Sequence, residues 1–225
     1  MLQLPFAIDC APPFLVVSFH EPQRMLSWTV TRPGTCSARH VAWLEVRNKD
    51  LPADVDADAL IASKASARGL DGIPLLVTSR DIRRHHVAQA TVEDVTATCV
   101  ATVGLSNGER VGRRASTPVP LGGTINILIH VNQPMTEGAY LETLSIVAQA
   151  RTVAVIEADI ERDRASITGT GTDCIVVAAP SGRPHARYAG LHTAIGEAVG
   201  KSTCEAMRAG IETWKEDFFR PGSSE

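Results

Sequence analysis

The chain has 225 residues, of which 44% are apolar and 21% are charged, and its formal net charge is −3. This length and composition suit one substantial domain with a real hydrophobic core. The nearly balanced charge gives no electrostatic footprint for nucleic acid or an anionic membrane surface, and no apolar run approaches the roughly 18 residues of a membrane-spanning helix.

The N-terminal stretch and the cysteines both predict a cytoplasmic protein. Residues 1–17 lack a basic leader and are interrupted by prolines, so they make a poor signal peptide. The five cysteines are an odd number, lie far apart and include no C-x-x-C pair, which argues against a disulfide framework or a zinc knuckle. We expect a single domain over residues 1–225, with loosely ordered ends at 1–13 and 218–225. A homo-oligomer is compatible with this sequence.

The N-terminal third predicts antiparallel strands followed by a helix. Runs rich in β-branched and aromatic residues indicate strands at 14–19, 25–31 and 40–47. Glu21-Pro22 separates the first two runs, which favours a hairpin. Asp56 opens an alanine-rich segment that stops before Gly69, and these signals predict a helix over 56–68. A short strand is expected at 74–78, and one or two helical turns at 81–89.

The rest of the chain alternates apolar strands with helices. Strands are expected at 95–105, 124–131 and 174–179, and we place these apolar runs at the centre of one sheet. Thr136 suits a helix start, and that helix extends to about Asp159, while the last helix covers 193–216. The pattern predicts an α+β (mixed α/β) fold: a single domain with a central β-sheet packed by helices and with antiparallel N-terminal strands. The order of the strands does not follow from the sequence.

Residues 168–200 combine the features of a chemical site in one stretch. A Gly/Thr turn ends in Asp173 and leads into an apolar strand. Tyr188, His192, Thr193 and Glu197 then gather at the start of the last helix. The backbone N–H groups of a glycine-rich turn and of a helix N-terminus can both face an anion or a developing oxyanion.

Each of these polar residues also has a plain structural interpretation. Asp173 can cap its own turn, His192 can cap the helix, and Glu197 is a first-turn acid favoured by the helix dipole. On one continuous helix His192 and Glu197 would point about 140° apart, so they converge only if His192 lies in the loop before the helix. Asn126 is different, because an amide inside an apolar strand needs a partner, either a ligand or a neighbouring loop.

Four motifs resemble those of one known family and occur in the same order. They are ATVGLSNGERVG (101–112), GGTINILI (122–129), the TEGA helix entrance (136–139), and GTGTD followed by IVVA and YAGLHTAIGE (169–197). Together they resemble the adenosylcobinamide amidohydrolases, the CbiZ family, from about residue 15 to about residue 209. The resemblance implies hydrolysis of the amide that joins aminopropanol to the corrin ring of adenosylcobinamide or a related corrinoid. The product would be adenosylcobyric acid, for corrinoid salvage and cobamide remodelling.

On this basis we assign roles as a hypothesis. His192 would carry protons, and Asp173 or Glu197 would orient it or activate water. Backbone N–H groups at 170–172 or at Thr193 would stabilise the oxyanion, and a covalent nucleophile at Thr170 or Thr172 is the lesser alternative. The expected substrate-binding residues are Ser106, Asn107, Thr124, Asn126, Thr170, Thr172, Tyr188 and Thr193.

The same resemblance implies one kind of partner and leaves two alternative functions open. The expected partner is a small-molecule corrinoid, whose cobalt belongs to the substrate, and no cofactor is required. One rival is a non-hydrolytic corrinoid-binding or delivery protein, which would share the pocket but need no acid or base. The other is an amidase or acyltransferase-like enzyme with a threonine nucleophile, which would form a covalent intermediate.

No metal site is predicted. The H-x-x-x-x-E spacing of His192 and Glu197 is no established zinc pattern, although these two residues and Asp173 are in principle ligands. Cys174 heads a buried strand, so we expect its sulfur to be inert core rather than a nucleophile.

The remaining candidates are given structural roles. The arginines and histidines at 83–86 are expected on a solvated helix face, with binding of a polar corrinoid edge as the alternative. Trp28, Trp43 and Tyr188 are expected in the core, because aromatic side chains dominate cores. A flat macrocycle would also use such surfaces, and Tyr188 lies beside the expected site.

Overall fold

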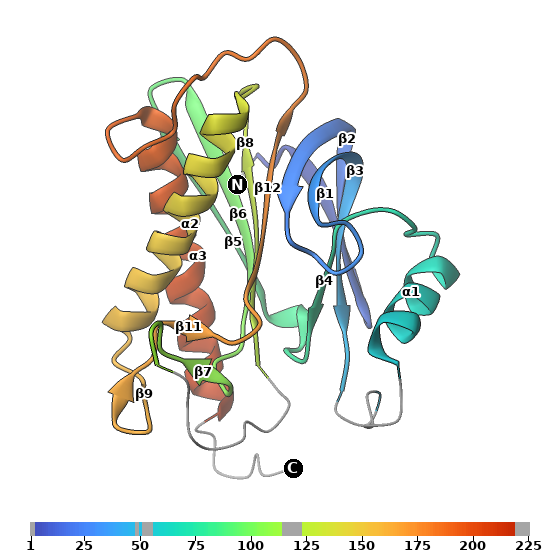
Figure 1. Cartoon of the computed structure of the whole chain (residues 1–225), viewed down its shortest axis with the longest axis vertical. Coiled ribbons are helices and arrows are strands. Elements are labelled where there is room, and N and C mark those ends of the chain that lie inside the picture. The colour runs from blue at the N-terminus through green and yellow to red at the C-terminus, as the bar shows by residue number, and fades with distance from the viewer. Residues whose placement is uncertain (1–2, 48–49, 51–55, 114–122, 219–225) are drawn as a thin grey trace.

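The structure is a computed structural model, and it describes residues 3–47, 50, 56–113 and 123–218. Its centre is an eight-stranded mixed sheet with the order β4-β3-β2-β12-β8-β6-β5, and β1 pairs with β2 beside this path. The strands are β1 (Phe6–Ala11), β2 (Phe14–Ser27), β3 (Gly34–Glu45), β4 (Leu75–Thr78), β5 (His85–Val92), β6 (Val95–Val103), β8 (Ile125–Val131) and β12 (Cys174–Pro180). The helices are α1 (Ala57–Ala67), α2 (Glu137–Glu157) and α3 (Ala194–Phe218) (Figure 1).

Two short ribbons and one turn complete the described part of the chain. The first ribbon joins β7 (Gly108–Glu109) to β11 (Gly169–Thr170), and the second joins β9 (Glu161–Arg162) to β10 (Ala165–Ser166). The 3-10 turn η2 (Ile82–Arg84) leads directly into β5.

The two faces of the central strands enter different cores. Helices α2 and α3 cover one face of β5, β6, β8 and β12 (Figure 1). In β8 the alternate residues Ile125, Ile127 and Ile129 pack toward these helices, whereas Leu128 packs against residues of β1 to β4. This alternation is the two-residue period of a strand. The second face therefore has a core of its own, which we call the inner core: Phe6, Leu15, Val17, Phe19, Trp43, Leu76, Val100, Leu128 and Val176 are among its members.

The predicted fold class is confirmed, since a mixed central sheet is packed by helices and β1, β2 and β3 pair antiparallel. The three strands expected at the centre are β6, β8 and β12, which are neighbours in the sheet. Two helix starts follow from their caps, because the side chains of Asp56 and Thr136 accept hydrogen bonds from the N–H groups of Ala59 (3.1 Å) and Ala139 (3.2 Å).

The N-terminal region differs from the prediction in two places. Residues 6–11 form β1, which pairs with 14–19, so the expectation of loose order at 1–13 is wrong over these residues. Residues 25–27 continue β2, so no hairpin forms at Glu21-Pro22. The register of β2 against β3 shifts between Ser18 and Gln23 instead. Such an irregularity tolerates proline, because an unpaired position needs no ladder hydrogen bond. The expected loose end at 218–225 lies, beyond Phe218, outside the described residues.

One or two helical turns were predicted at 81–89, but only the first is present, as η2. After η2 the chain extends as β5, so the solvated helix face expected at 83–86 is limited to Arg83 and Arg84 in η2. His85 and His86 point to opposite faces of the sheet, as consecutive strand residues do. His86 lies against α3, where a Cβ placed on Gly210 would be 3.5 Å from its ring. Burial lowers the pKa of His86.

Acidification should destabilise the protein through His130, which is 4% exposed and packs against the rings of Phe6 and Phe19. Burial lowers the pKa of His130 to about 4, against about 6.5 in an unfolded chain. Between these two pKa values the unfolded state binds a proton that the folded state does not. The free energy of unfolding therefore decreases as the pH is lowered through this range, by up to about 3 kcal/mol. Urea titrations at neutral and acidic pH should show this loss, and it should be missing from His130→Gln. Identical pH dependence in the two proteins would contradict the assignment.

Candidate active site

Three of the four motif segments meet at one end of the sheet. Strands β8 and β12 are parallel, so they begin at the same end, and the antiparallel strand β6 finishes there. The pairing of β7 with β11 brings the loop after β6 beside the turn before β12. We call residues 104–109, 123–126 and 168–174 the Asp173 end; it lies in the lower half of Figure 1.

Asp173 ties these segments together. Its carboxylate accepts hydrogen bonds from the N–H groups of Thr170 (3.0 Å) and Ile125 (3.2 Å) and from the Thr170 hydroxyl. It also forms an ion pair with Arg151 of α2, and its side chain is 7% exposed. Burial raises the pKa of the Asp173 carboxyl, while the Arg151 guanidinium and the hydrogen bonds oppose this rise. These contacts make Asp173 a buried hub that positions other groups.

Two threonine hydroxyls form a chain beside this hub. The Thr172 hydroxyl donates to Thr124 Oγ1 (3.0 Å), and the Thr124 hydroxyl donates to the carbonyl oxygen of Thr172 (2.9 Å). The amide nitrogen of Asn107 lies 3.4 Å from Thr172 Oγ1 and donates to it. Thr124 is buried and Thr172 is exposed, so Thr172 is the member of the chain that a substrate can reach.

Only one of the two polar side-chain atoms of Asn126 has a hydrogen-bond partner among the described residues. The residue is 1% exposed, and its amide nitrogen donates to the carbonyl oxygen of Val77 at the end of β4 (2.8 Å). Its amide oxygen has no hydrogen-bond partner in the part of the chain that the structure describes. A neighbouring strand therefore satisfies half of this amide and leaves the other half available.

The glycines of these motifs allow the segments to approach closely. A Cβ on Gly104 would lie 2.9 Å from the Cα of Gly123, and one on Gly123, whose φ is +98°, would lie 2.8 Å from the backbone nitrogen of Ser106. A Cβ on Gly169 would meet the Asp173 carboxylate at 2.6 Å. Contacts this short exclude a side chain, so packing explains glycine at positions 104, 123 and 169.

The other motif residues lie at the opposite end of the sheet. Thr193 caps α3, because its hydroxyl donates to the carbonyl oxygen of Gly190 (2.8 Å) and accepts from the N–H group of Gly196 (3.0 Å). The loop before it is held by α2: the carboxylate of Glu142 accepts from the Ala189 N–H (2.6 Å). The TEGA and YAGLHTAIGE motifs therefore anchor the loop between β12 and α3. We call residues 134–142 and 185–197 the Thr193 end.

The expected pairing of Asp173 with His192 is wrong. Asp173 precedes β12 and His192 follows it, and seven strand residues at ~3.3 Å each span about 20 Å. His192 and Glu197 are exposed, and so is Tyr188 at 59%, so its expected place in the core is wrong. Of the predicted residues, the structure brings together Asp173, Thr170, Thr172, Thr124, Asn126, Asn107 and Ser106, and it leaves His192, Glu197, Tyr188 and Thr193 elsewhere.

Two residues that contact the Asp173 end were missed by sequence reasoning, and a third, Trp28, was expected in the core with a macrocycle-binding surface as the alternative. Arg151 is the only basic residue of α2, and a lone cation in the apolar second half of this helix was an available signal of a buried ion pair. The Ser79 hydroxyl accepts from the N–H group of Gly123 (2.6 Å) and had no such signal. Trp28 was expected in the core but is 45% exposed, and its indole nitrogen donates to the carbonyl oxygen of Asp173 (2.9 Å). Trp43, in contrast, is fully buried as expected.

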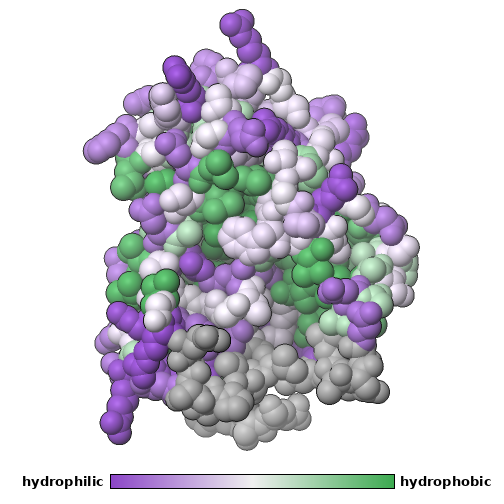
Figure 2. Space-filling model, viewed as in Figure 1, coloured by the Kyte–Doolittle hydropathy of each residue, from purple (hydrophilic) through white to green (hydrophobic). Residues whose placement is uncertain are grey.

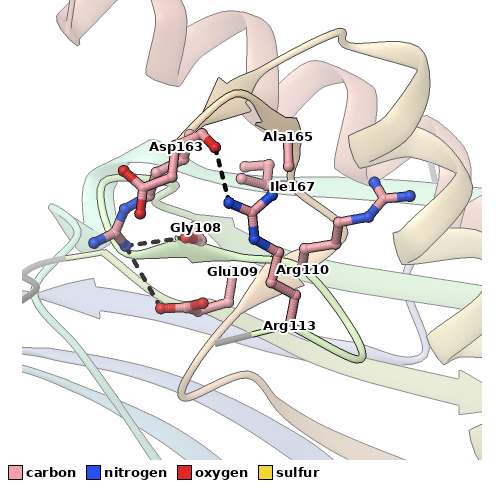
Figure 3. Close-up of a pocket in the computed structure, with 8 residues that line it drawn as sticks. Gly108, Glu109, Arg110, Arg113, Asp163, Ala165 and Ile167 are labelled. Carbon is pink, nitrogen blue, oxygen red and sulfur yellow. Dashed lines mark hydrogen bonds and ion pairs between the residues drawn. The ribbon is translucent and has the colours of Figure 1, made fainter. Parts of the chain in front are cut away.

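A small arginine-lined cavity adjoins this end between β7 and the β9–β10 ribbon (Figure 3). Its volume is about 20 Å³, enough for a water molecule but far too small for a macrocycle. Arg110 and Arg113 donate to the carbonyl oxygens of Ser166 (2.7 Å) and Asp163 (3.2 Å), so these guanidinium groups brace the ribbon.

Two features are absent from residues 3–47, 50, 56–113 and 123–218. No three His, Cys, Asp or Glu side chains gather there as metal ligands would. No helix within the described ranges combines the length and apolar character needed to cross a bilayer.

Comparison with known proteins gives one family match. The sequence model of the adenosylcobinamide amidohydrolase family matches residues 5–218. An uncharacterised protein of Methanocaldococcus jannaschii is 26% identical over 217 residues, which cover 84% of this chain and 81% of the relative. An adenosylcobinamide amidohydrolase of Halobacterium salinarum is 26% identical over 174 residues, which cover 75% of this chain and 69% of the relative.

Solved structures show looser likenesses. The PH0078 protein of Pyrococcus horikoshii aligns over 88% of this chain and 77% of its own, with 9% identity and a TM-score of 0.43. An L-aminopeptidase D-Ala-esterase/amidase of Ochrobactrum anthropi, a variant of the Ntn hydrolase fold, aligns over 92% and 82%, with 10% identity and a TM-score of 0.44. At these values the likeness carries no functional information.

Proposed function

The chain belongs to the adenosylcobinamide amidohydrolase family, and we propose that it hydrolyses the amide linking aminopropanol to the corrin ring of adenosylcobinamide or a related corrinoid. The products are adenosylcobyric acid and aminopropanol. This reaction serves corrinoid salvage and cobamide remodelling in the cytoplasm, and the cobalt is part of the substrate rather than a cofactor of the protein.

We place the reaction at the Asp173 end. The observation that supports this choice is the convergence of three separate family motifs on a packed network that leaves one threonine hydroxyl exposed. The half-exposed indole of Trp28, fixed by its bond to the Asp173 carbonyl, offers a flat apolar surface beside this hydroxyl. The Thr193 end gives less reason to place the reaction there, because helix capping and loop anchoring account for its motif residues.

Amide hydrolysis needs donors for the tetrahedral oxyanion. The Thr172 hydroxyl donates to Thr124, and by rotating toward a bound substrate it can donate, together with the Asn107 amide nitrogen, to the carbonyl oxygen of the scissile amide. Thr172 is less suited to act as the nucleophile. Its proton passes to Thr124, and the chain of donors then ends on a backbone carbonyl rather than on a base. We therefore favour water as the attacking group.

Incubation of the purified protein with adenosylcobinamide tests the proposal directly. We expect release of aminopropanol and adenosylcobyric acid in equal amounts, and mass spectrometry detects both products. Tight binding of the corrinoid without aminopropanol release would show a binding or delivery protein instead. Accumulation of a corrinoid covalently attached to the chain would show a threonine nucleophile.

Cys174→Ala should leave the activity unchanged. Burial raises the pKa of the Cys174 thiol to about 12, so the reactive thiolate is scarce at neutral pH. The residue packs in the inner core beside Val176. The check is kcat for aminopropanol release, with folding followed by circular dichroism. A folded but inactive Cys174→Ala protein would make this cysteine the nucleophile.

The activity should also be independent of a protein-bound metal, because the described residues present no cluster of ligating side chains. Prolonged chelation followed by desalting, with metal content measured, should leave kcat as it was. A loss that added Zn²⁺ or Mn²⁺ restores would contradict this expectation.

A further inference from the structure

Three buried side-chain oxygen atoms near the Asp173 end have no hydrogen-bond partner among the described residues; they belong to Asn107, Thr102 and Asn126, and the last two are adjacent. Thr102 of β6 and Asn126 of β8 are direct partners in the sheet register and are 0% and 1% exposed. Neither Thr102 Oγ1 nor Asn126 Oδ1 has a hydrogen-bond partner among the described residues. Buried polar groups are nearly always satisfied, so two adjacent exceptions indicate a bound group.

The position of this pair suits a single small molecule. Side chains of directly opposed residues have Cβ atoms about 4.5–5.5 Å apart, so one water molecule can bond to both. Both residues face the inner core, since Val100 and Leu128, two positions further along the strands, belong to it. Thr124 lies two residues before Asn126 and so shares this face at the end of the strand.

His85 extends the pair into a row of three. It is the register partner of Thr102 on β5, so its imidazole lies on the same face, and it is partly exposed. Nδ1 lies 2.8 Å from the carbonyl oxygen of Ile82, which can only accept, so Nδ1 carries the proton. The neutral ring therefore presents the lone pair of Nε2, which is the arrangement of a general base.

We infer that Thr102 and Asn126 hold the hydrolytic water and that His85 Nε2 accepts its proton. This inference rests on the proposed amide hydrolysis and supplies the base that His192, at the opposite end, cannot. His85 is then a catalytic residue, whereas Thr102 and Asn126 position the water.

The step balances without a further reactant. The water oxygen attacks the amide carbonyl carbon and its proton passes to His85, which gives a tetrahedral oxyanion and an imidazolium. The carbon–nitrogen bond then breaks, and the imidazolium returns the proton to the departing nitrogen. Proton transfer between the products leaves a carboxylate and protonated aminopropanol.

The test variants are His85→Gln and Thr102→Val, and the chain offers a matched control for each. His86→Gln changes the neighbouring histidine on the opposite face, beside α3. Thr98→Val changes a fully buried threonine on the same strand and face as Thr102, but its hydroxyl has a partner, the Gln89 amide nitrogen at 2.9 Å. Both controls should keep kcat near the wild-type value.

His85→Gln should lower kcat about 10²–10⁴-fold, and imidazole added to His85→Gly should restore part of the rate. Thr102→Val should lower kcat about tenfold, the loss expected of one hydrogen bond, with KM unchanged, and Thr102→Ser should restore it. Wild-type activity combined with an active His85→Gln protein overturns the inference but leaves the proposed function intact. Absence of aminopropanol release by the wild type refutes the proposed function instead.

A high-resolution crystal structure provides a readout that does not depend on activity. We expect an ordered water within hydrogen-bond distance of Thr102 Oγ1 and Asn126 Oδ1, and no such density in Thr102→Val. A dry contact between these side chains in the wild type would overturn the inference whatever the protein hydrolyses.

Discussion

Arg151→Met should lose about 3–5 kcal/mol of unfolding free energy, because it leaves the Asp173 carboxylate buried without its cation. The Arg151 and Asp173 side chains are 18% and 7% exposed, so little solvent screens either charge. Without the guanidinium, only the hydrogen bonds from Thr170 and Ile125 oppose the burial-driven rise in the pKa of Asp173. The folded variant can then bind a proton that the unfolded chain releases, so its loss relative to the wild type should shrink on acidification.

The measurement is chemical unfolding of the variant and of a matched surface pair. Arg208 on α3 pairs with Glu157 on α2, and these side chains are 55% and 52% exposed. Arg208→Met should therefore cost no more than about 1 kcal/mol. Combining Arg151→Met with Asp173→Asn should cost less than the sum of the single changes, because the double variant leaves no unpaired charge. Equal losses of unfolding free energy from Arg151→Met and Arg208→Met would show that the buried ion pair stabilises the protein no more than the exposed pair does.

Much of the fold could be predicted from local signals. The caps Asp56 and Thr136 set two helix starts, and the apolar runs at 95–105, 124–131 and 174–179 identified the three central strands. What failed depended on distant partners. The strand β1 is stabilised by pairing with β2 and by contact of Phe6 with Phe19, and its own residues between prolines carry only a weak strand signal.

The site was only half predictable for a related reason. The stretch 168–200 is continuous in the chain, but β12 crosses the sheet between its two polar groups and separates them. Closeness in sequence thus suggested a partnership between Asp173 and His192 that the strand prevents. Besides Thr170 in its own turn, the partners of Asp173 come from α2 and β8, through Arg151 and the N–H group of Ile125. Such contacts follow from the packing of separate elements, which the spacing of residues within one segment does not reveal.

Thr172→Val should lower kcat about 10²–10³-fold, which is the usual effect of removing one donor to an oxyanion. The hydroxyl is exposed and lies beside the Asn107 amide nitrogen, so the substitution removes a reachable donor at nearly constant volume. Folding should change little, because the side chain is not buried. The measurement is steady-state kcat and KM for aminopropanol release.

Thr172→Ser is the matched control, because it keeps the hydroxyl and should keep most of the activity. A Thr172→Val protein with wild-type kcat would remove this residue from the oxyanion site. Equal loss in Thr172→Val and Thr172→Ser would instead indicate that the methyl group matters and that the hydroxyl does not.

The comparison of Thr172→Val with His192→Ala tests the location of the chemistry most directly. The two residues lie at opposite ends of β12, and both are exposed, so neither change should unfold the protein. With kcat for aminopropanol release measured on both folded variants, we predict near wild-type turnover for His192→Ala and a loss of about 10²–10³-fold for Thr172→Val. Turnover abolished in His192→Ala and preserved in Thr172→Val would contradict the account and move the active site to the Thr193 end.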